Sequence, residues 1–246
     1  MTVGQRGEPI RISKAASILG VSAQTLRNWE RSGKLVPQRS TGGHRYYDVQ
    51  QLERFQIHVK QLGWTWAASS QAPELSEEYY CERQDRFTSR LEHLGKELSQ
   101  ALPDEVQGLV SLLTLLAGEI GDNSFTHNIG NWPDVPGVFF AYEQEKRRII
   151  LADRGRGVRH TLQRVRPQIT NDVSALQIAF TEMISGRSPE KRGNGLKVVR
   201  RTAELHPIGL IYQSGIGLVR IQKGLRRMRI TASDQNVRGV FSVIEF

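Results

Sequence analysis

Two oxygen-bearing side chains stand one helical turn apart in the C-terminal half of the chain. Glu119 and Asn123 follow leucine and isoleucine residues that recur every three or four positions, a spacing typical of a helix with one buried face. Residues four apart lie on the same side of a helix, so this carboxylate and carboxamide could together hold Mg²⁺ and polarise a water molecule. Taken alone, the pair is also typical of an ordinary solvated helix end.

Two glycine-rich segments further along the chain could approach a ligand closely. Asp153 begins the run Asp-Arg-Gly-Arg-Gly, in which Gly155 and Gly157 lack the Cβ that would keep a flat ligand away from the backbone. The Asp153 carboxylate could accept a hydrogen bond from an exocyclic amine, although a simple glycine turn explains the run equally well. The second segment opens a helix, where backbone amides favour phosphate, and consists of Gly193, Asn194, Gly195 and Leu196.

The elements that must position these residues are helices and strands. The pattern predicts a helix that starts at Pro103 and carries Glu119 near its end. It then predicts strands over 137–142 and 148–152, a mobile cationic flap over 158–192, and a helix over 197–206. Three terminal strands are expected over 210–212, 227–230 and 240–244.

This order of segments resembles the GHKL-type ATPase domain, which histidine kinases, gyrase and mismatch-repair ATPases share. The resemblance covers residues 104–246 and implies an α/β sandwich, with a mixed sheet under a layer of helices, that binds ATP with Mg²⁺ beneath a lid. It would make Glu119 the base or water-positioning carboxylate, Asn123 the Mg²⁺ ligand and Asp153 the adenine reader. Gly155 and Gly157 would shape the base pocket, and residues 193–196 would meet the phosphates.

Two positions depart from the pattern of that family. Lys197 stands where many kinases have a further glycine, and Val240 replaces the threonine that commonly borders the adenine. Because one lost hydroxyl contact costs only about 0.5–1.5 kcal/mol, we expect binding to survive, whereas turnover and affinity are left open.

The N-terminal residues predict a different module. Two short helices, over 12–20 and 23–31, are separated by a turn at Gly20-Val21-Ser22, in which Ser22 is a good N-cap for the second helix. The second helix of a helix-turn-helix enters the major groove, so the polar residues opposite Leu26 and Trp29 would reach bases or phosphates. These residues are Gln24, Thr25, Arg27, Asn28 and Arg31.

A β-hairpin wing is predicted next, because two β-prone stretches flank Gly42-Gly43. Its cationic and aromatic residues, which we expect to contact the sugar-phosphate backbone, are Arg39, His44, Arg45 and Tyr46. A helix that Asp48 caps, with Leu52, Phe55 and Val59 facing the core, should follow. The run from Leu26 to Phe55 resembles the MerR-type winged helix-turn-helix. That resemblance implies double-stranded DNA binding, usually as a dimer on a two-fold site.

Residues 63–103 differ from both flanking parts in being net acidic and in carrying a loop around Pro73. Helix formers follow over 74–102, with Tyr80, Phe87 and Leu94 among apolar residues at helical spacing. This helix could dimerise the protein, as the helix after the winged domain usually does in MerR-like proteins. It could equally pack against the C-terminal domain of its own chain.

Composition narrows the class of protein. The chain of 246 residues has 34 Lys+Arg against 25 Asp+Glu, and this net charge of +9 favours a polyanionic partner. A single cysteine, Cys81, excludes an internal disulfide. The sequence shows neither a spanning apolar run nor a secretory signal, so we expect a cytoplasmic protein without membrane contact.

We therefore predict an α+β protein with a winged helix-turn-helix over 1–62, a helical linker over 63–103 and a histidine-kinase-like ATPase sandwich over 104–246. The predicted function is that of a homodimeric transcriptional regulator whose DNA binding or assembly is modulated by bound ATP, with Mg²⁺-dependent hydrolysis left open. Two alternatives remain. One is a DNA-localised kinase that phosphorylates serine or histidine on a partner protein, and the other is a nucleotide-binding scaffold without turnover.

Overall fold

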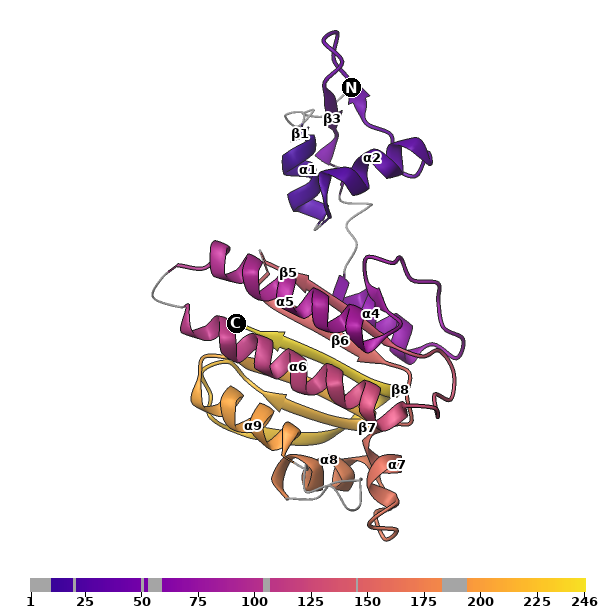
Figure 1. The fold of residues 1–246 in the computed structure, drawn as a ribbon, viewed down its shortest axis with the longest axis vertical. Helices are drawn as coiled ribbons and strands as arrows, with labels where there is room; N and C mark the ends of the chain where they lie inside the picture. Colours follow the sequence, from indigo (N-terminus) through magenta and orange to yellow (C-terminus); the bar gives the residue numbers. More distant parts are fainter. Residues whose placement is uncertain are drawn as a thin grey trace, which may run out of the picture. The chain divides into compact units, whose positions relative to one another are not determined.

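The computed structural model describes residues 10–19, 21–49, 51–52, 59–103, 107–144, 146–182 and 194–246. The chain divides into two compact units, residues 1–58 and 59–246 (Figure 1).

The first unit combines two helices with a small sheet. Its elements are β1 (Ile10–Arg11), α1 (Ile12–Leu19), α2 (Ala23–Arg31), β2 (Gln38–Arg39) and β3 (Arg45–Tyr47). The strands form an antiparallel sheet in the order β1-β3-β2. Buried residues from both helices and from β3 share one core, in which Ala15, Leu26 and Tyr47 are at most 1% exposed. The predicted helix-turn-helix is therefore present.

Local chemistry explains the turns of this unit. Ser22 caps α2, because its hydroxyl accepts a hydrogen bond from the Thr25 N–H at 2.9 Å. The wing turns at Gly43, whose φ of +77° is a conformation that suits glycine. The helix predicted to start at Asp48 includes Leu52, which is fully buried, whereas Phe55 lies outside the described residues.

The second unit is built on a five-stranded sheet in the order β4-β5-β6-β8-β7. These strands are β4 (Tyr80–Cys81), β5 (Val138–Glu143), β6 (Arg148–Asp153), β7 (Gly209–Ile221) and β8 (Met228–Glu245). The four pairings described are all antiparallel, so the expectation of a mixed sheet is wrong for this part of the chain. The physical reason is that β5–β6 and β7–β8 are hairpins, and β8 enters beside β6 in the opposite direction.

Helices cover both faces of this sheet. On one face lie α5 (Gln84–Ala101), α6 (Gly108–Asn128) and α9 (Gly195–Leu205), and on the other lies α4 (Val59–Ala68) (Figure 1). Alternate residues of a strand point to opposite faces of the sheet. Phe140, Leu151 and Val240 pack into the core under α5 and α6. On the α4 side, a Cβ at Gly63 would lie 2.9 Å from the Phe139 ring. Burial on both faces explains why the strands read as continuous apolar runs.

Two shorter helices complete the unit, α7 (Gly157–Gln163) and α8 (Asp172–Thr181). Within the described part of the chain, no helix combines the length and the apolar character that crossing a membrane requires.

The structure differs from the predicted linker over 63–103. Helix α4 packs on β5, β6 and β8, and β4 pairs with β5, so this segment is part of the second unit. The predicted helix over 74–102 begins only at Gln84, because Tyr80 and Cys81 form the edge strand instead. Helix α5 packs against α6 of its own chain, which is one of the two arrangements expected.

Two further expectations need correction. The predicted flap over 158–192 contains α7 and α8, so it is helical in its first part, and residues 183–193 lie outside the described residues. The three predicted terminal strands are in fact two long ones, because β8 runs unbroken from Met228 to Glu245 and joins the strands predicted over 227–230 and 240–244, and β7 continues beyond residue 212 through a bulge at Gly215 and Gly217.

Candidate functional sites

The exposed face of α2 carries a row of polar side chains that bond to one another. Gln24 Nε2 donates to Asn28 Oδ1 at 3.1 Å, and Arg27 donates to Gln24 Oε1 at 3.2 Å. Arg31 also donates to the Asn28 carboxamide. The predicted groove-reading residues therefore form one continuous surface, except that Thr25 is half-buried beside Ser22.

The wing is tied to α2 through one carboxylate. Glu30 accepts hydrogen bonds from Arg39 and Arg45, each at 2.6 Å. These two guanidinium groups hold the pKa of Glu30 below its ordinary value. His44 is exposed near the tip of the wing, and Tyr46 is half-buried in β3. Arg39 and Arg45 thus fix the wing against α2 as well as contributing positive charge to its surface.

In the second unit, the end of α6 meets the start of α9. A Cβ placed on Gly195 would lie 2.5 Å from Glu119 Oε2 and 3.2 Å from Asn123 Nδ2. Only a glycine lets the two helices approach this closely with these side chains in place. The structure therefore brings together the predicted pair Glu119 and Asn123 and the predicted segment around Gly195. Asn194 is exposed and Leu196 is half-buried, whereas Gly193 lies outside the described residues.

Asp153 is connected to the same stretch of α6. Its carboxylate accepts a hydrogen bond from the Ser124 hydroxyl at 2.7 Å and from the Gly155 N–H at 2.8 Å, and the Val240 N–H also donates to it. Burial raises the pKa of Asp153, and these three hydrogen bonds oppose that rise. Asp153 is 1% exposed, so the partners that the structure gives its carboxylate are groups of the chain itself.

Glycines around Asp153 make room for the polar groups of the chain itself. A Cβ at Gly155 would lie 2.2 Å from Asn128 Nδ2, and one at Gly157 would lie 2.9 Å from Ser214 Oγ. A Cβ at Gly239 would lie 2.0 Å from Asp153 Oδ1. The role of Gly155 and Gly157 beside a nucleotide base stays a prediction, because the space next to them is used by Asn128 and Ser214.

Lys197 lies in the first turn of α9 and donates to the backbone carbonyl of Glu182. It is half-buried, and this burial lowers the pKa of its ammonium group. Lys197 therefore links the first turn of α9 to Glu182, the residue that follows α8. It also places a cation at the start of the helix that carries Gly195.

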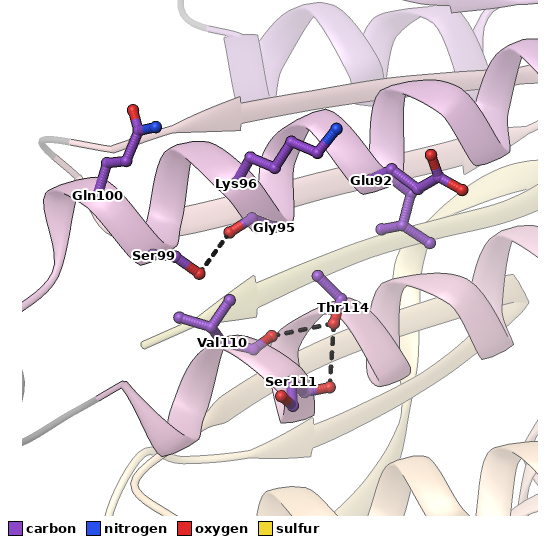
Figure 2. A pocket seen from close by; sticks show the side chains of 9 residues that line it. Glu92, Gly95, Lys96, Ser99, Gln100, Val110, Ser111 and Thr114 are labelled. Carbon is purple, nitrogen blue, oxygen red and sulfur yellow. Dashed lines mark hydrogen bonds between the residues drawn. The ribbon is translucent and has the colours of Figure 1, made fainter.

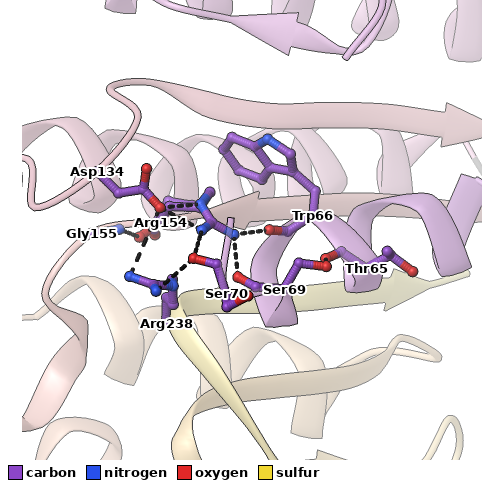
Figure 3. Close-up of polar contacts among 9 residues, drawn as sticks. Thr65, Trp66, Ser69, Ser70, Asp134, Arg154, Gly155 and Arg238 are labelled. Atoms are coloured by element: carbon purple, nitrogen blue, oxygen red, sulfur yellow. Dashed lines mark hydrogen bonds and ion pairs between the residues drawn. The ribbon is translucent and has the colours of Figure 1, made fainter. Parts of the chain in front are cut away.

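Arg154, which follows Asp153, has a fully buried side chain (Figure 3). It forms an ion pair with Asp134, in which Nε lies 2.8 Å from Oδ2. It also donates to the backbone carbonyls of Trp66, Ser69 and Ser70, at the end of α4 and just beyond it. Arg238 reaches the same Ser70 carbonyl at 2.7 Å. The loop after Asp153 is thereby fixed to α4.

An open groove of about 640 Å³ lies elsewhere, between α5 and α6 (Figure 2). Leu91 and Gly95 line it on α5, and Val110 and Thr114 line it on α6. None of the residues predicted for nucleotide binding lines this groove.

Four polar residues of these arrangements escaped the sequence interpretation: Ser124, Asn128, Arg154 and Ser214. Ser124 directly follows Asn123, and Arg154 occupies the variable position of the Asp-x-Gly run. For Ser124 and Arg154 these positions were the available signal, whereas Asn128 and Ser214 lie in none of the motifs, and the bonding partners come from segments far away in the sequence.

A helix-turn-helix followed by a β-wing defines a DNA-binding module. Residues 10–63 match the protein family described as MerR HTH family regulatory protein. This part of the chain is therefore a MerR-family helix-turn-helix domain. Such domains bind double-stranded DNA and often act as dimers, and they are typical of transcription regulators.

One curated protein is similar to a short part of the chain. The type II methyltransferase M.Eco47II of Escherichia coli is 46% identical over 50 residues, which is 20% of this chain and 12% of that protein. An alignment of this length leaves most of the second unit unmatched.

Proposed function

We propose that this protein is a DNA-binding transcription regulator whose second unit binds ATP with Mg²⁺, and that nucleotide occupancy changes its DNA binding. The observation that carries the proposal is that three segments with predicted nucleotide-binding residues lie close together in the fold. The end of α6, the loop after β6 and the start of α9 are far apart in sequence, yet Gly195 adjoins Glu119 and Asn123. Ser124, on the same helix, bonds to Asp153.

The residues fit this ligand in their chemistry. The Asp153 carboxylate would accept a hydrogen bond from an exocyclic amine, and the start of α9 would present backbone amides to phosphate, beside the Lys197 ammonium group that donates to the Glu182 carbonyl. Asn123 would hold Mg²⁺, which would neutralise phosphate charge. The described residues contain no group of three or more His, Cys, Asp or Glu that could hold a metal ion. The phosphates themselves would therefore complete the ligand set, as is common for Mg²⁺.

Glu119 is the candidate for positioning a water molecule. Its half-buried carboxylate lies against Gly195 and beside Asn123. If ATP is hydrolysed, replacing this carboxylate by an amide should stop turnover while nucleotide binding persists.

Arg154 offers a physical route from the nucleotide site to the DNA-binding unit. It lies between Asp153 and Gly155 in the chain and holds the end of α4 through backbone carbonyls. Helix α4 begins at Val59, the first residue of the second unit, directly after the DNA-binding unit in the chain. A shift of the Asp153 loop on binding would therefore move α4. Coupling of this kind changes the affinity for DNA only as far as the nucleotide-bound and nucleotide-free states differ in the free energy of their contacts with DNA.

The test is an equilibrium titration of a fluorescent duplex, selected from a randomised pool, with the full-length protein at constant salt. It is run without nucleotide, with Mg-ATP and with Mg-ADP. We expect Mg-ATP to change the dissociation constant by about 5-fold to 150-fold, the usual range for coupled sites.

The matched variants are Asn123→Ala, which should abolish the nucleotide effect, and Asp122→Ala, which should retain it. Asp122 neighbours Asn123 but is exposed and bonds to Gln84 of α5. An unchanged dissociation constant for the wild type under all three conditions contradicts the coupling.

A further inference from the structure

A dense group of cations surrounds the turn between β7 and β8. We call it the cationic hairpin, and it consists of Arg220, Lys223, Arg226, Arg227 and Arg229. All five residues are exposed. Gly224, with φ at +80°, and a hydrogen bond from the Leu225 N–H to the Gln222 carbonyl shape the turn, so the cations are presented by ordered backbone. The two strands can be followed in Figure 1.

Two of these arginines directly oppose each other across the sheet. Arg220 pairs with Arg229 in the antiparallel register of β7 and β8. Side chains at directly opposite positions project from the same face and lie roughly 5 Å apart at their Cβ atoms, and like charges at such positions are destabilising. The hairpin therefore retains a repulsion that an anion placed between the two guanidinium groups would relieve.

The charge of the cationic hairpin is not balanced by ion pairs among the described residues. None of its five side chains forms an ion pair or a side-chain hydrogen bond there. Glu204 of α9 and Glu245 of β8 have other neighbours. Glu204 binds Arg200 and the Met228 N–H, and Glu245 opposes Arg148 across β6 and β8.

We propose that the cationic hairpin is a second DNA contact, which binds the phosphate backbone of the duplex held by the first unit. Four of the five residues are arginine, whose planar guanidinium binds phosphate through two parallel hydrogen bonds. The two units are covalently joined, so a duplex bound by the helix-turn-helix is present at raised local concentration for the second unit. A weak backbone contact then adds measurably to the affinity.

This inference extends the DNA binding of the first unit and is independent of ATP. Phosphate contacts carry no sequence information, so the cationic hairpin should strengthen binding to every sequence alike. Each phosphate neutralised on B-DNA releases counterions and steepens the dependence of log K on log salt by about 0.9.

The experiment measures the affinity of the full-length protein for a 40-base-pair duplex over a series of salt concentrations, without nucleotide. The hairpin variant carries Arg220→Gln, Arg227→Gln and Arg229→Gln. The control variant carries Arg83→Gln, Arg86→Gln and Lys96→Gln, which removes the same charge from exposed residues at and just before α5. We expect the hairpin variant to lower the salt slope by about 2 to 3, and the control to leave it within one unit of the wild-type value.

A variant with a weakened helix-turn-helix distinguishes DNA binding by the cationic hairpin from DNA binding by the first unit. In a protein carrying Arg27→Ala and Asn28→Ala, the residual binding should depend on the cationic hairpin and fall further when its charges are removed. The melting midpoint of the hairpin variant at low salt should not decrease, because Arg220 and Arg229 repel each other. Equal salt slopes for the hairpin and control variants overturn the proposal, as does a hairpin effect on one DNA sequence but not on others.

Discussion

Asp153 and Arg154 are neighbouring buried residues of the second unit with opposite charges and different hydrogen-bond partners. Asp153 is almost completely buried and accepts hydrogen bonds from the Ser124 hydroxyl and the Gly155 N–H. Arg154 uses its guanidinium on Asp134 and on three backbone carbonyls, close to its full donor capacity. Arg154 thus fixes the loop that carries Asp153, and adenine recognition by Asp153 is part of the proposed function.

Replacing Arg154 by methionine should destabilise the second unit by about 3 kcal/mol or more. The change keeps much of the volume but leaves Asp134 and the carbonyls of Trp66 and Ser69 without their donor. Urea unfolding followed by tryptophan fluorescence measures this loss.

The matched control is Arg238→Met. Arg238 contacts Ser70 and Asp134 as well, but its side chain is 41% exposed, so its removal should cost under about 1 kcal/mol. Equal losses for the two variants would mean that burial of Arg154 does not stabilise the loop.

The positions of candidate site residues could be predicted from sequence only where a motif is local. Glu119 and Asn123 are one helical turn apart, so their common direction followed from the spacing, and Gly195 was found because it opens a helix. Ser124 and Asn128 could not be assigned, because their partners Asp153 and Arg156 are reached only by folding. Gly155 was expected to make room for a nucleotide base, but the group that occupies the space beside it is the Asn128 side chain.

At the scale of elements, the first unit depends on the link between α2 and the wing. Glu30 at the end of α2 holds Arg39 of β2 and Arg45 of β3. Because the hydrogen bonds from Arg39 and Arg45 lower the pKa of Glu30 in the folded state, the ionised carboxylate stabilises the folded form. This contribution is present above the unfolded pKa of about 4.3 and is lost as the pH falls through the folded pKa.

Glu30→Gln should therefore loosen the wing at neutral pH and have less effect in acid. The measurement is amide hydrogen exchange of the β2–β3 segment in the full-length protein. We expect faster exchange in the variant at pH 7, and convergence with the wild type, after correction for intrinsic rates, once the pH falls below the folded pKa of Glu30. A difference that persists unchanged at low pH would show that the ion pairs are not its cause.

The helices and strands that sequence patterns predicted correctly are those that local residues specify. The helix-turn-helix and the wing were predictable because capping and turn residues, such as Ser22 and Gly43, specify them locally. The helical character of 158–182 was missed because its cations suggested a surface flap. Residues 59–68 are adjacent to the DNA-binding unit in sequence, yet α4 is held by Phe139 and Phe241 of the sheet, which no local pattern reveals.

At the scale of the whole molecule, a MerR-family DNA-binding domain is joined to a larger α/β unit with its own core. We propose that nucleotide binding in the second unit changes DNA binding by the first. In support, α4 follows the DNA-binding unit in the chain, and Arg154 attaches α4 to the Asp153 loop. The cationic hairpin would give the second unit a contact with the same duplex. The proposed coupling, unlike the hairpin contact, depends on whether the second unit binds an adenine nucleotide.

Equilibrium binding of a fluorescent ATP analogue with Mg²⁺ tests that claim most directly. The proteins are the wild type, Asp153→Asn and the control Asp122→Asn, which makes the same chemical change at an exposed carboxylate. We expect saturable binding to the wild type that ATP displaces and GTP does not. We also expect at least a tenfold weaker affinity in Asp153→Asn alone, since an amide presents a donor where the amine needs an acceptor. Absence of saturable binding to the folded wild type, or displacement by GTP as readily as by ATP, would contradict the claim.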